Sequence, residues 1–350
     1  MQERLKCGII GYGYMGEIRK RVIDARDDLV LVGVSEPDTG KHANIQGCET
    51  FADAAALLAR GLDLVFVATP NHVVPRYAIE SLRAGCHVFC EKPPGRNLQD
   101  ILDIRAAEDA GGKLMFGFNH RYHPAVLKAK AIIDSGRLGA VVNLRGLYGK
   151  SGGRNYTASW RNDPKISGGG ILLDQGIHML DLFRFFAGEF EEVKCFTSNG
   201  FWKTPVEDNA YVILRGSSGV HAILHSSATL WRHIFRCEIT LEQGYLVIEG
   251  LLSKSGSYGR ERLTMARREF EDEAAAVGNP AEEVTYFDRD LSWEMEIDAF
   301  VKAIREDLPV EFSNSTDALR VMEIIARAYE DADISQDRLS RAKVAGGAAS

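Results

Sequence analysis

Two short patterns place polar side chains where they could do acid–base chemistry. Asp174 and His178 stand four residues apart in the apolar run ILLDQGIHMLDLF. On a helix, this spacing brings two side chains to one face, and Asp181 follows one turn further along. A carboxylate beside an imidazole can orient it and support its protonated form. The pair is therefore a candidate for proton transfer.

A lysine follows another apolar run. Glu91-Lys92-Pro93 comes directly after CHVFC, and a proline after the lysine can take a cis bond that fixes a tight turn. The direction of Lys92 would then be set by the backbone. Each of these patterns has a structural alternative: a histidine on an apolar helix can be a hydrogen-bonded core residue, and a lysine after a strand can be a solvated charge.

The N-terminal glycines give a more specific signal. Gly11-Tyr12-Gly13-Tyr14-Met15-Gly16 follows an apolar run and opens a helical pattern. In that setting the first glycine suits a tight turn, the second lets the backbone approach a pyrophosphate, and the third lets the helix pack on the sheet. The motif predicts dinucleotide binding by these six residues.

Glu36 bears on the choice of cofactor. It ends the second apolar run, twenty residues after Gly16, where a carboxylate can accept hydrogen bonds from the adenosine ribose. The same charge would repel the 2′-phosphate of NADP, and no arginine follows immediately. NAD is expected rather than NADP. The alternative is a solvated turn acid beside Pro37 and Asp38.

The elements that must position these residues fall into two groups. Apolar runs LKCGII, LVLVGV, LDLVFVAT, CHVFC and KLMFGFN alternate with helical patterns, among them one from about Tyr14 and one over VPRYAIESLRAG. Strands that alternate with helices predict a doubly wound α/β domain with a parallel sheet. From about Tyr122 the pattern changes.

The later part of the chain begins with a helix from Pro124 to about Ser135, the strand AVVNLRGLYG and the helix ILLDQGIHMLDLFRFFAG. The two-fold-periodic runs VKCFTSN, NAYVILRG, VHAILHSS, FRCEITLE and YLVIEG follow. Strands clustered in this way predict a large, open, mainly antiparallel sheet in an α+β domain. Two amphipathic helices, at about 293–305 and 316–331, close the folded part.

With 350 residues, the chain exceeds the size of one hydrophobic core. We expect a nucleotide-binding domain over 1–121, a substrate and oligomerisation domain over 122–332, and a flexible tail over 333–350. The closing helix near 316–331 is a candidate to pack back on the first domain.

Bulk properties exclude several classes of protein. A formal net charge of −7 argues against a nucleic-acid partner. No segment reads as a signal peptide or a membrane span. The six cysteines are scattered without a C-x-x-C pair, which favours reduced thiols in a cytoplasmic protein and no metal site.

Taken in order, the glycine motif, Glu91-Lys92-Pro93, Asn119-x-Arg121 and the Asp174-x-x-x-His178 helix resemble the glucose–fructose oxidoreductase and inositol dehydrogenase family, Gfo/Idh/MocA, over residues 4 to 332. The resemblance implies Lys92 near the nicotinamide and the reacting hydroxyl, His178 as acid/base and Asp174 as its companion. It also implies further residues that line the cofactor: Thr69, Pro70, Asn71, His72 and Glu91.

The reaction implied is hydride transfer between a nicotinamide cofactor and a secondary alcohol or ketone of a sugar, cyclitol or nucleotide-activated sugar. Oxidation needs a base for the hydroxyl proton. His178 would be that base, Lys92 would stabilise alkoxide character, and Asp174 would tune both.

The loop KSGGRNYTASWRNDPKISGGG precedes the candidate catalytic helix and should hold the substrate. Tyr156 and Trp160 could stack on a sugar face, while Lys150, Arg154 and Arg161 could hold a carboxylate or a diphosphate. Asn119 and Arg121 could contact substrate or only stabilise their loop.

Two rival functions stay open. Some proteins that resemble this family are glycosidases that hold NAD and act by transient oxidation, and some relatives are non-catalytic NAD-binding regulators. A non-catalytic regulator would be expected to have lost the lysine or the histidine, and both Lys92 and His178 are present. The resemblance also implies a homodimer or homotetramer built through the C-terminal sheet.

Overall fold

The structure, a computed structural model, describes residues 3–108, 111–253, 256–271 and 275–347, with the side chains of 334–347 not described. The chain forms two compact units. The first comprises Met1–Asn119, Lys165–Gly168 and Leu291–Leu319, and the second His120–Pro164, Gly169–Asp290 and Arg320–Ser350. The main boundary lies two residues before the expected one, and the segment around 291–319 belongs to the first unit although the sequence assigned it to the second.

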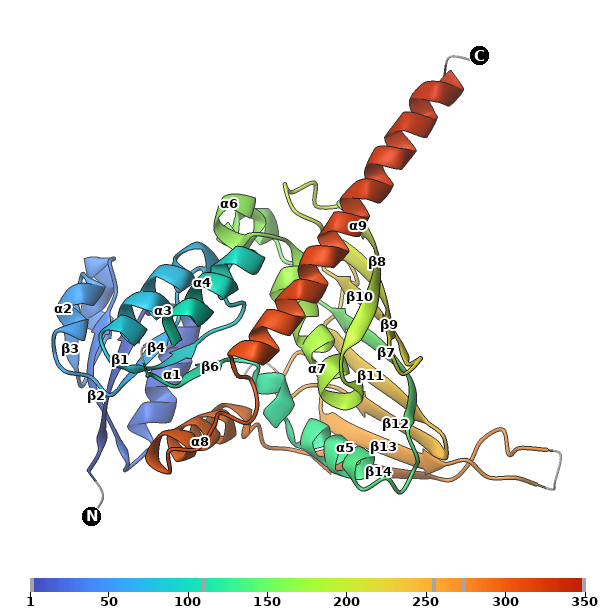
Figure 1. The fold of residues 1–350 in the computed structure, drawn as a ribbon, viewed down its shortest axis with the longest axis horizontal. Helices are drawn as coiled ribbons and strands as arrows, with labels where there is room; N and C mark the ends of the chain where they lie inside the picture. The colour runs from blue at the N-terminus through green and yellow to red at the C-terminus, as the bar shows by residue number, and fades with distance from the viewer. Residues whose placement is uncertain (1–2, 109–110, 254–255, 272–274, 348–350) are drawn as a thin grey trace. The chain divides into compact units, whose positions relative to one another are not determined.

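The first unit contains a six-stranded sheet, drawn in blue to cyan in Figure 1, with the strand order β3-β2-β1-β4-β5-β6. All neighbouring strands are parallel. The predicted doubly wound parallel sheet is therefore confirmed. Its strands are β1 (Leu5–Ile10), β2 (Leu29–Ser35), β3 (Glu49–Phe51), β4 (Leu64–Val67), β5 (His87–Cys90) and β6 (Leu114–Phe116). The sequence analysis missed β3, a three-residue edge strand.

Helices cover both faces of this sheet, because right-handed crossovers that run in opposite directions from β1 lie on opposite faces. The helix after β1 packs on β1, β2 and β4, the helix after β3 packs on β1, β2 and β3, and the helix after β4 packs on β4 and β5. The helices of this unit are α1 (Tyr14–Asp24), α2 (Ala54–Leu58), α3 (Val74–Arg83), α4 (Leu98–Glu108) and α8 (Ser292–Arg305), with 3-10 turns η1 (Thr39–Asn44) and η2 (Asn71–Val73). Helix α8 packs against α1, and α3 against α4.

An eight-stranded sheet dominates the second unit, with the order β14-β13-β12-β11-β7-β10-β9-β8. Only the β7–β10 pair is parallel, so the predicted open, mainly antiparallel sheet is confirmed. The strands are β7 (Val141–Gly149), β8 (Phe190–Ser198), β9 (Asn209–Gly216), β10 (His221–Ser227), β11 (Ile234–Leu241), β12 (Gly244–Glu249), β13 (Glu261–Arg267) and β14 (Glu282–Phe287). The last two strands were not predicted.

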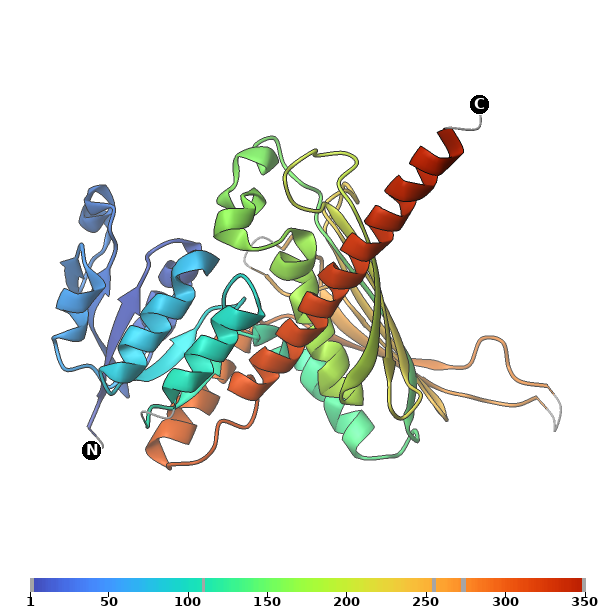
Figure 2. The ribbon, with the colours of Figure 1, turned by 45° about the horizontal axis from the view of Figure 1, so that its top comes forward.

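One face of the eight-stranded sheet is covered by helices. Figures 1 and 2 both show α7 (Ile177–Ala187) and α9 (Ser315–Gly347) over the same face. Helix α5 (Pro124–Asp134) packs on β12, β13 and β14, and α9 is tied to β8 by the Lys194–Asp331 ion pair, 2.6 Å long. The remaining elements are η3 (Asn119–Tyr122), η4 (Tyr156–Ala158), η5 (Trp160–Asn162), α6 (Pro164–Ser167) and the π-helical turn η6 (Leu172–Gly176).

Helix α9 is longer than expected. It continues to Gly347, beyond the predicted end at about 331, and the last residues of the predicted tail, 348–350, lie outside the described residues. Flexibility of this tail stays a prediction.

The opposite face of the eight-stranded sheet exposes apolar side chains. Tyr211 lies across from Phe196, and Ile213 lies across from Ile223. Between 46% and 60% of the surface of each of these four residues is exposed. These four residues, on β8, β9 and β10, are called the apolar sheet face below. A patch of this kind on a sheet indicates an interaction surface.

A buried ion network joins three elements of the first unit. Arg19 on α1 is fully buried. Its guanidinium donates to Glu91 at the end of β5, 2.7 Å away, and to Glu296 on α8, 2.5 Å away. It also lies 4.3 Å from the centre of the Phe89 ring. Removing one member of such a network leaves buried charge without its partner.

We therefore expect Arg19→Met to lower the free energy of unfolding by about 3–5 kcal/mol, because two buried carboxylates lose their counter-charge. Urea unfolding measures this. The control is Asp24→Asn, which breaks the half-exposed Lys20–Asp24 pair on the same helix and should cost below about 0.5 kcal/mol. Equal losses in the two variants would contradict a stabilising role for the Arg19 network.

Candidate active site

The glycine loop between β1 and α1 is shaped for a close backbone approach. Gly11 has φ +92°, and a Cβ there would lie 2.6 Å from the Ala68 carbonyl oxygen. A Cβ on Gly16 would lie 2.3 Å from the Gly11 carbonyl oxygen, whereas one on Gly13 would meet no atom within 4 Å. Gly13 also caps α1 without a side-chain hydrogen bond. The helix N-terminus therefore offers backbone amides to an anion such as a pyrophosphate.

Glu36 lies against this loop. The carboxylate is buried and accepts hydrogen bonds from the Tyr12 amide at 2.9 Å and the Asp38 amide at 3.1 Å. Lys41, a cation that the sequence reasoning missed, lies 3.4 Å from the same carboxylate. Glu36 is thus placed beside the glycine loop, where it can meet a ribose. Together the loop and the acid fit a dinucleotide.

Residues after β4 were predicted to line the cofactor. The Thr69 hydroxyl is buried, and among the described residues it has no hydrogen-bond partner, so it is available to a bound group. Asn71 is buried and donates to the Ser167 carbonyl at 2.7 Å. Its amide therefore fixes the 165–168 segment within the first unit. Pro70 is half-buried and His72 is exposed.

Lys92 follows β5 at the carboxyl edge of the parallel sheet, where such sheets bind ligands. It is half-buried, and the Lys92–Pro93 peptide bond is cis. The preceding Glu91 is held by Arg19. Lys92 therefore lies on backbone that is anchored from one side by a buried ion pair.

In the second unit, the segment that carries Asp174 is not the regular α-helix that the sequence predicted. Asp174 lies in the π-helical turn η6, and His178 lies in the first turn of α7. The sequence argument assumed a regular α-helix, and the pairing of Asp174 with His178 stays a prediction. Single π-helical turns inside helices are common at functional sites.

The π-helical turn is anchored by Glu207. Its carboxylate accepts hydrogen bonds from the Gly170 amide at 2.9 Å, the Leu172 amide at 3.0 Å and the Tyr329 hydroxyl at 2.9 Å. Burial raises the pKa of Glu207, and these hydrogen bonds oppose the shift. Glu207 thus satisfies backbone donors at the start of the helix that carries both candidate residues.

Two cations flank Asp174. Lys150 lies 2.5 Å from one carboxylate oxygen and Arg161 lies 3.3 Å from the other. The sequence analysis named both as residues that could hold a carboxylate or a diphosphate of the substrate, and that role stays a prediction beside their contact with this acid. The Trp160 ring lies 4.5 Å from the Arg161 guanidinium.

Two other loop residues predicted to contact substrate lie in different surroundings. Tyr156 packs on Trp202 with ring centres 4.6 Å apart, while Arg154 is exposed.

His178 is buried against a histidine that the sequence reasoning passed over. Its ring stacks on His120 with centres 3.7 Å apart and planes inclined by 16°. The His120 Nε2 lies 3.0 Å from the Tyr148 hydroxyl, and the Tyr258 hydroxyl donates to Gln175 at 3.3 Å. His120 is the middle residue of the Asn119-x-Arg121 pattern, so its position was available in the sequence but its partner was not.

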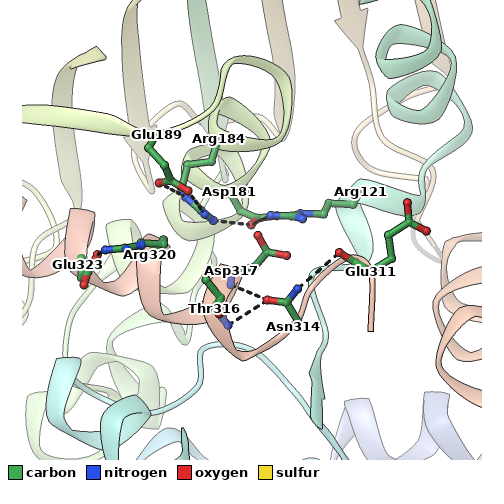
Figure 3. A network of polar contacts seen from close by, with 10 residues as sticks. All are labelled: Arg121, Asp181, Arg184, Glu189, Glu311, Asn314, Thr316, Asp317, Arg320 and Glu323. Carbon is green, nitrogen blue, oxygen red and sulfur yellow. Dashed lines mark hydrogen bonds and ion pairs between the residues drawn. The ribbon is translucent and has the colours of Figure 1, made fainter. Parts of the chain in front are cut away.

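Asn119 and Arg121 make contacts within their own units. Asn119 donates to the Ser292 hydroxyl at 3.3 Å. Arg121 forms two hydrogen bonds to Asp181, at 2.8 and 2.6 Å, and Figure 3 shows this pair beside Arg184. These contacts support the structural alternative for both residues, and a substrate role stays a prediction.

Fold and site together define a dinucleotide-binding protein with a second, open-sheet unit. Residues 5–118 match the model described as "Oxidoreductase family, NAD-binding Rossmann fold", and residues 126–247 match the "GFO/IDH/MocA C-terminal domain". The chain belongs to the Gfo/Idh/MocA family, and its first unit is the NAD-binding Rossmann fold of that family.

Individual relatives agree with this assignment. A levoglucosan dehydrogenase of Pseudarthrobacter phenanthrenivorans is 34% identical over 62% of this chain and 60% of its own length. An inositol 2-dehydrogenase of Rhizobium meliloti is 28% identical over 64% of this chain and 68% of its own length. The structure of a levoglucosan dehydrogenase with NADH and levoglucosan superposes with a TM-score of 0.84 over 95% of this chain and 98% of that chain, at 24% identity, which shows the shared fold.

Two features are absent from the described part of the chain. None of the helices in this part has the length and apolar character to cross a membrane, and no group of three or more histidine, cysteine or acidic side chains among its residues could hold a metal ion.

The position of Glu36 leads to a prediction about cofactor choice. Glu36→Ala should weaken NAD binding roughly ten-fold, because hydrogen bonds to a charged group are lost. It should also improve NADP relative to NAD, because the charge that repels a 2′-phosphate is removed and Lys41 remains. Titration calorimetry with both cofactors measures this, with Asp38→Asn as the matched control at a neighbouring exposed acid. An unchanged ratio of the two affinities would exclude Glu36 from the selection.

Proposed function

We propose that this protein is an NAD-dependent dehydrogenase that oxidises a secondary hydroxyl of a sugar, cyclitol or nucleotide-activated sugar, or reduces the corresponding ketone. The observation that carries the proposal is the retention of Lys92, Asp174 and His178 at structured positions of a chain of this family. Lys92 follows β5 at the carboxyl edge of a nucleotide-binding sheet, and the other two lie on an anchored helix start. A protein that only bound NAD would need none of the three.

NAD, when bound, accepts a hydride from the carbon that is oxidised. His178 takes the hydroxyl proton as general base, and the Lys92 ammonium stabilises the negative charge that develops on the substrate oxygen. Asp174 orients the reacting groups. Lys150 and Arg161 compensate the charge of Asp174. Asp174 therefore stabilises the protonated form of His178 less than a carboxylate without such partners would.

The same ion pairs bear on the substrate. Lys150 and Arg161 are engaged by Asp174, which leaves Arg154 as the remaining predicted cation of the loop. This supports an uncharged sugar or cyclitol over a substrate that carries a diphosphate. The names of the levoglucosan and inositol dehydrogenases that match this chain point to the same class.

We also propose a location for the enzyme in the cell. All six cysteines are free thiols, and five of them are buried. Reduced thiols suit the cytoplasm, where we place the enzyme.

The function is tested by screening sugars, cyclitols and nucleotide sugars with NAD at 340 nm and then comparing His178→Asn with the parent on the best substrate. A positioned base contributes about 10² to 10⁴ in rate, so turnover should fall by that factor while NAD binding survives. The oxidation rate of the parent should rise with pH through one ionisation, and the variant should lose this limb.

Other outcomes would contradict the proposal. Release of free sugar from a glycoside without net NADH would identify a glycosidase that acts by transient oxidation. NAD binding with no turnover on any substrate would identify a regulator. A destabilised His178→Asn protein with an unaltered pH profile would assign His178 to the core.

We also propose that copies of the chain assemble through the apolar sheet face. Paired rows of exposed apolar side chains, such as Tyr211 with Phe196 and Ile213 with Ile223, are costly to leave in water.

Ile213→Asp should reduce the mass measured by sedimentation velocity, because it places a charge in the centre of the apolar sheet face. Arg215→Gln, at an exposed charged position two residues along β9, should leave the mass unchanged. A monomeric parent, or an Ile213→Asp protein that still assembles, would refute an interface at this face.

A further inference from the structure

The close stacking of His120 on His178 has no counterpart in the mechanism above. The ring centres are 3.7 Å apart, and the residues are only 5% and 4% exposed. Both residues belong to the second unit, His120 from η3 and His178 from α7. Two imidazoles in face-to-face contact cannot pass a proton through their faces, because the exchangeable hydrogens lie in the ring planes.

A chain of hydroxyl groups fixes His120. The His120 Nε2 lies within hydrogen-bond distance of the Tyr148 hydroxyl, 3.0 Å away, and the Tyr258 hydroxyl donates to Gln175. The contact with Tyr148 fixes the direction of the His120 ring. Burial raises the pKa of both tyrosines, which keeps them neutral donors.

The acids of this region already have cationic partners. Asp174 contacts Lys150 and Arg161, and Asp181 contacts Arg121 and Arg184.

A third buried acid also has its partners. Glu261 contacts His123, whose ring lies 5.5 Å from that of His120, and accepts a hydrogen bond from the Ala125 amide at 2.7 Å. The stacked His120 ring, held in turn by its contact with Tyr148, is therefore the contact that fixes the plane of the His178 ring.

We propose that His120 is a positioning residue that holds the plane of the His178 ring by stacking on it, so that the nitrogen that accepts the substrate proton keeps its direction. This inference rests on the proposed function. In the oxidation step, the substrate O–H bond breaks and an N–H bond forms on His178, while the hydride goes to NAD. His120 takes no part in this proton transfer, and His178 returns its proton to solvent before the next turnover.

Two variants separate the effects of the ring and of its nitrogens. His120→Phe keeps a flat ring and loses the nitrogens, while His120→Asn keeps a donor for Tyr148 and loses the ring. His120→Phe should therefore keep a plateau rate near that of the parent, whereas His120→Asn should lower the plateau rate by up to roughly 10² and leave the KM for NAD unchanged.

A matched control exists in the same unit. His225 stacks on Tyr211 with ring centres 4.2 Å apart and planes inclined by 14°, and His225→Asn, which removes a stacked ring elsewhere, should keep the plateau rate of the parent. Melting temperature and the KM for NAD, both expected to stay near the parent values in His120→Phe, show that the variant is folded and binds the cofactor. If His120→Phe does not fold, the plateau rate of folded His120→Asn decides.

The possible failures are distinguishable. If the parent shows no acid limb, or His178→Asn retains it, the proposed function of His178 fails. If the limb disappears in His178→Asn but folded His120→Asn keeps the parent plateau rate, or His120→Phe loses as much rate as His120→Asn, the function stands and the role of His120 is overturned.

Discussion

Buried charge that must be matched is the constraint on which the rest of this structure depends. In the first unit, Arg19 lies fully buried between Glu91 and Glu296, so that α1, the end of β5 and α8 are held together at the turn that carries Lys92. In the second unit, the buried Arg121–Asp181 pair fixes α7 to the segment that follows β6. Breaking a buried pair lowers the free energy of unfolding far more than breaking a surface pair. The geometry of each candidate site therefore depends on the same contacts that stabilise its unit.

The same need to match buried charge explains why polar partners surround the candidate catalytic residue Asp174 and the turn that carries it. Asp174 lies between two cations, and Glu207 satisfies the backbone donors of the turn that carries it. The π-helical turn places one extra residue between the anchored start of the helix and His178. The backbone of Asp174 and His178, the proposed reacting residues, is thus fixed by neighbouring residues that take no part in the reaction.

Local sequence patterns predicted much of the fold. The glycine motif and the buried strand runs identified the parallel sheet, and two-fold periodicity identified five strands of the second sheet. Strand β3 was missed because three residues carry no periodicity. Strands β13 and β14 were missed because charged residues flank their short apolar alternation in ERLTMAR and EEVTYF. The contacts of Asp174 with Lys150, and of His178 with His120, could not be predicted, because they join residues 24 and 58 positions apart whose approach depends on tertiary packing.

The central claim is that Lys92 serves the chemistry and not the affinity for NAD. The measurement that tests it most directly is Lys92→Met, with the NAD dissociation constant and the turnover number determined on the same preparation. The account predicts unchanged NAD binding and turnover lower by about 10² to 10³, because the ammonium stabilises charge that develops only in the transition state. Near-normal turnover, or a loss explained entirely by weaker NAD binding, would contradict it.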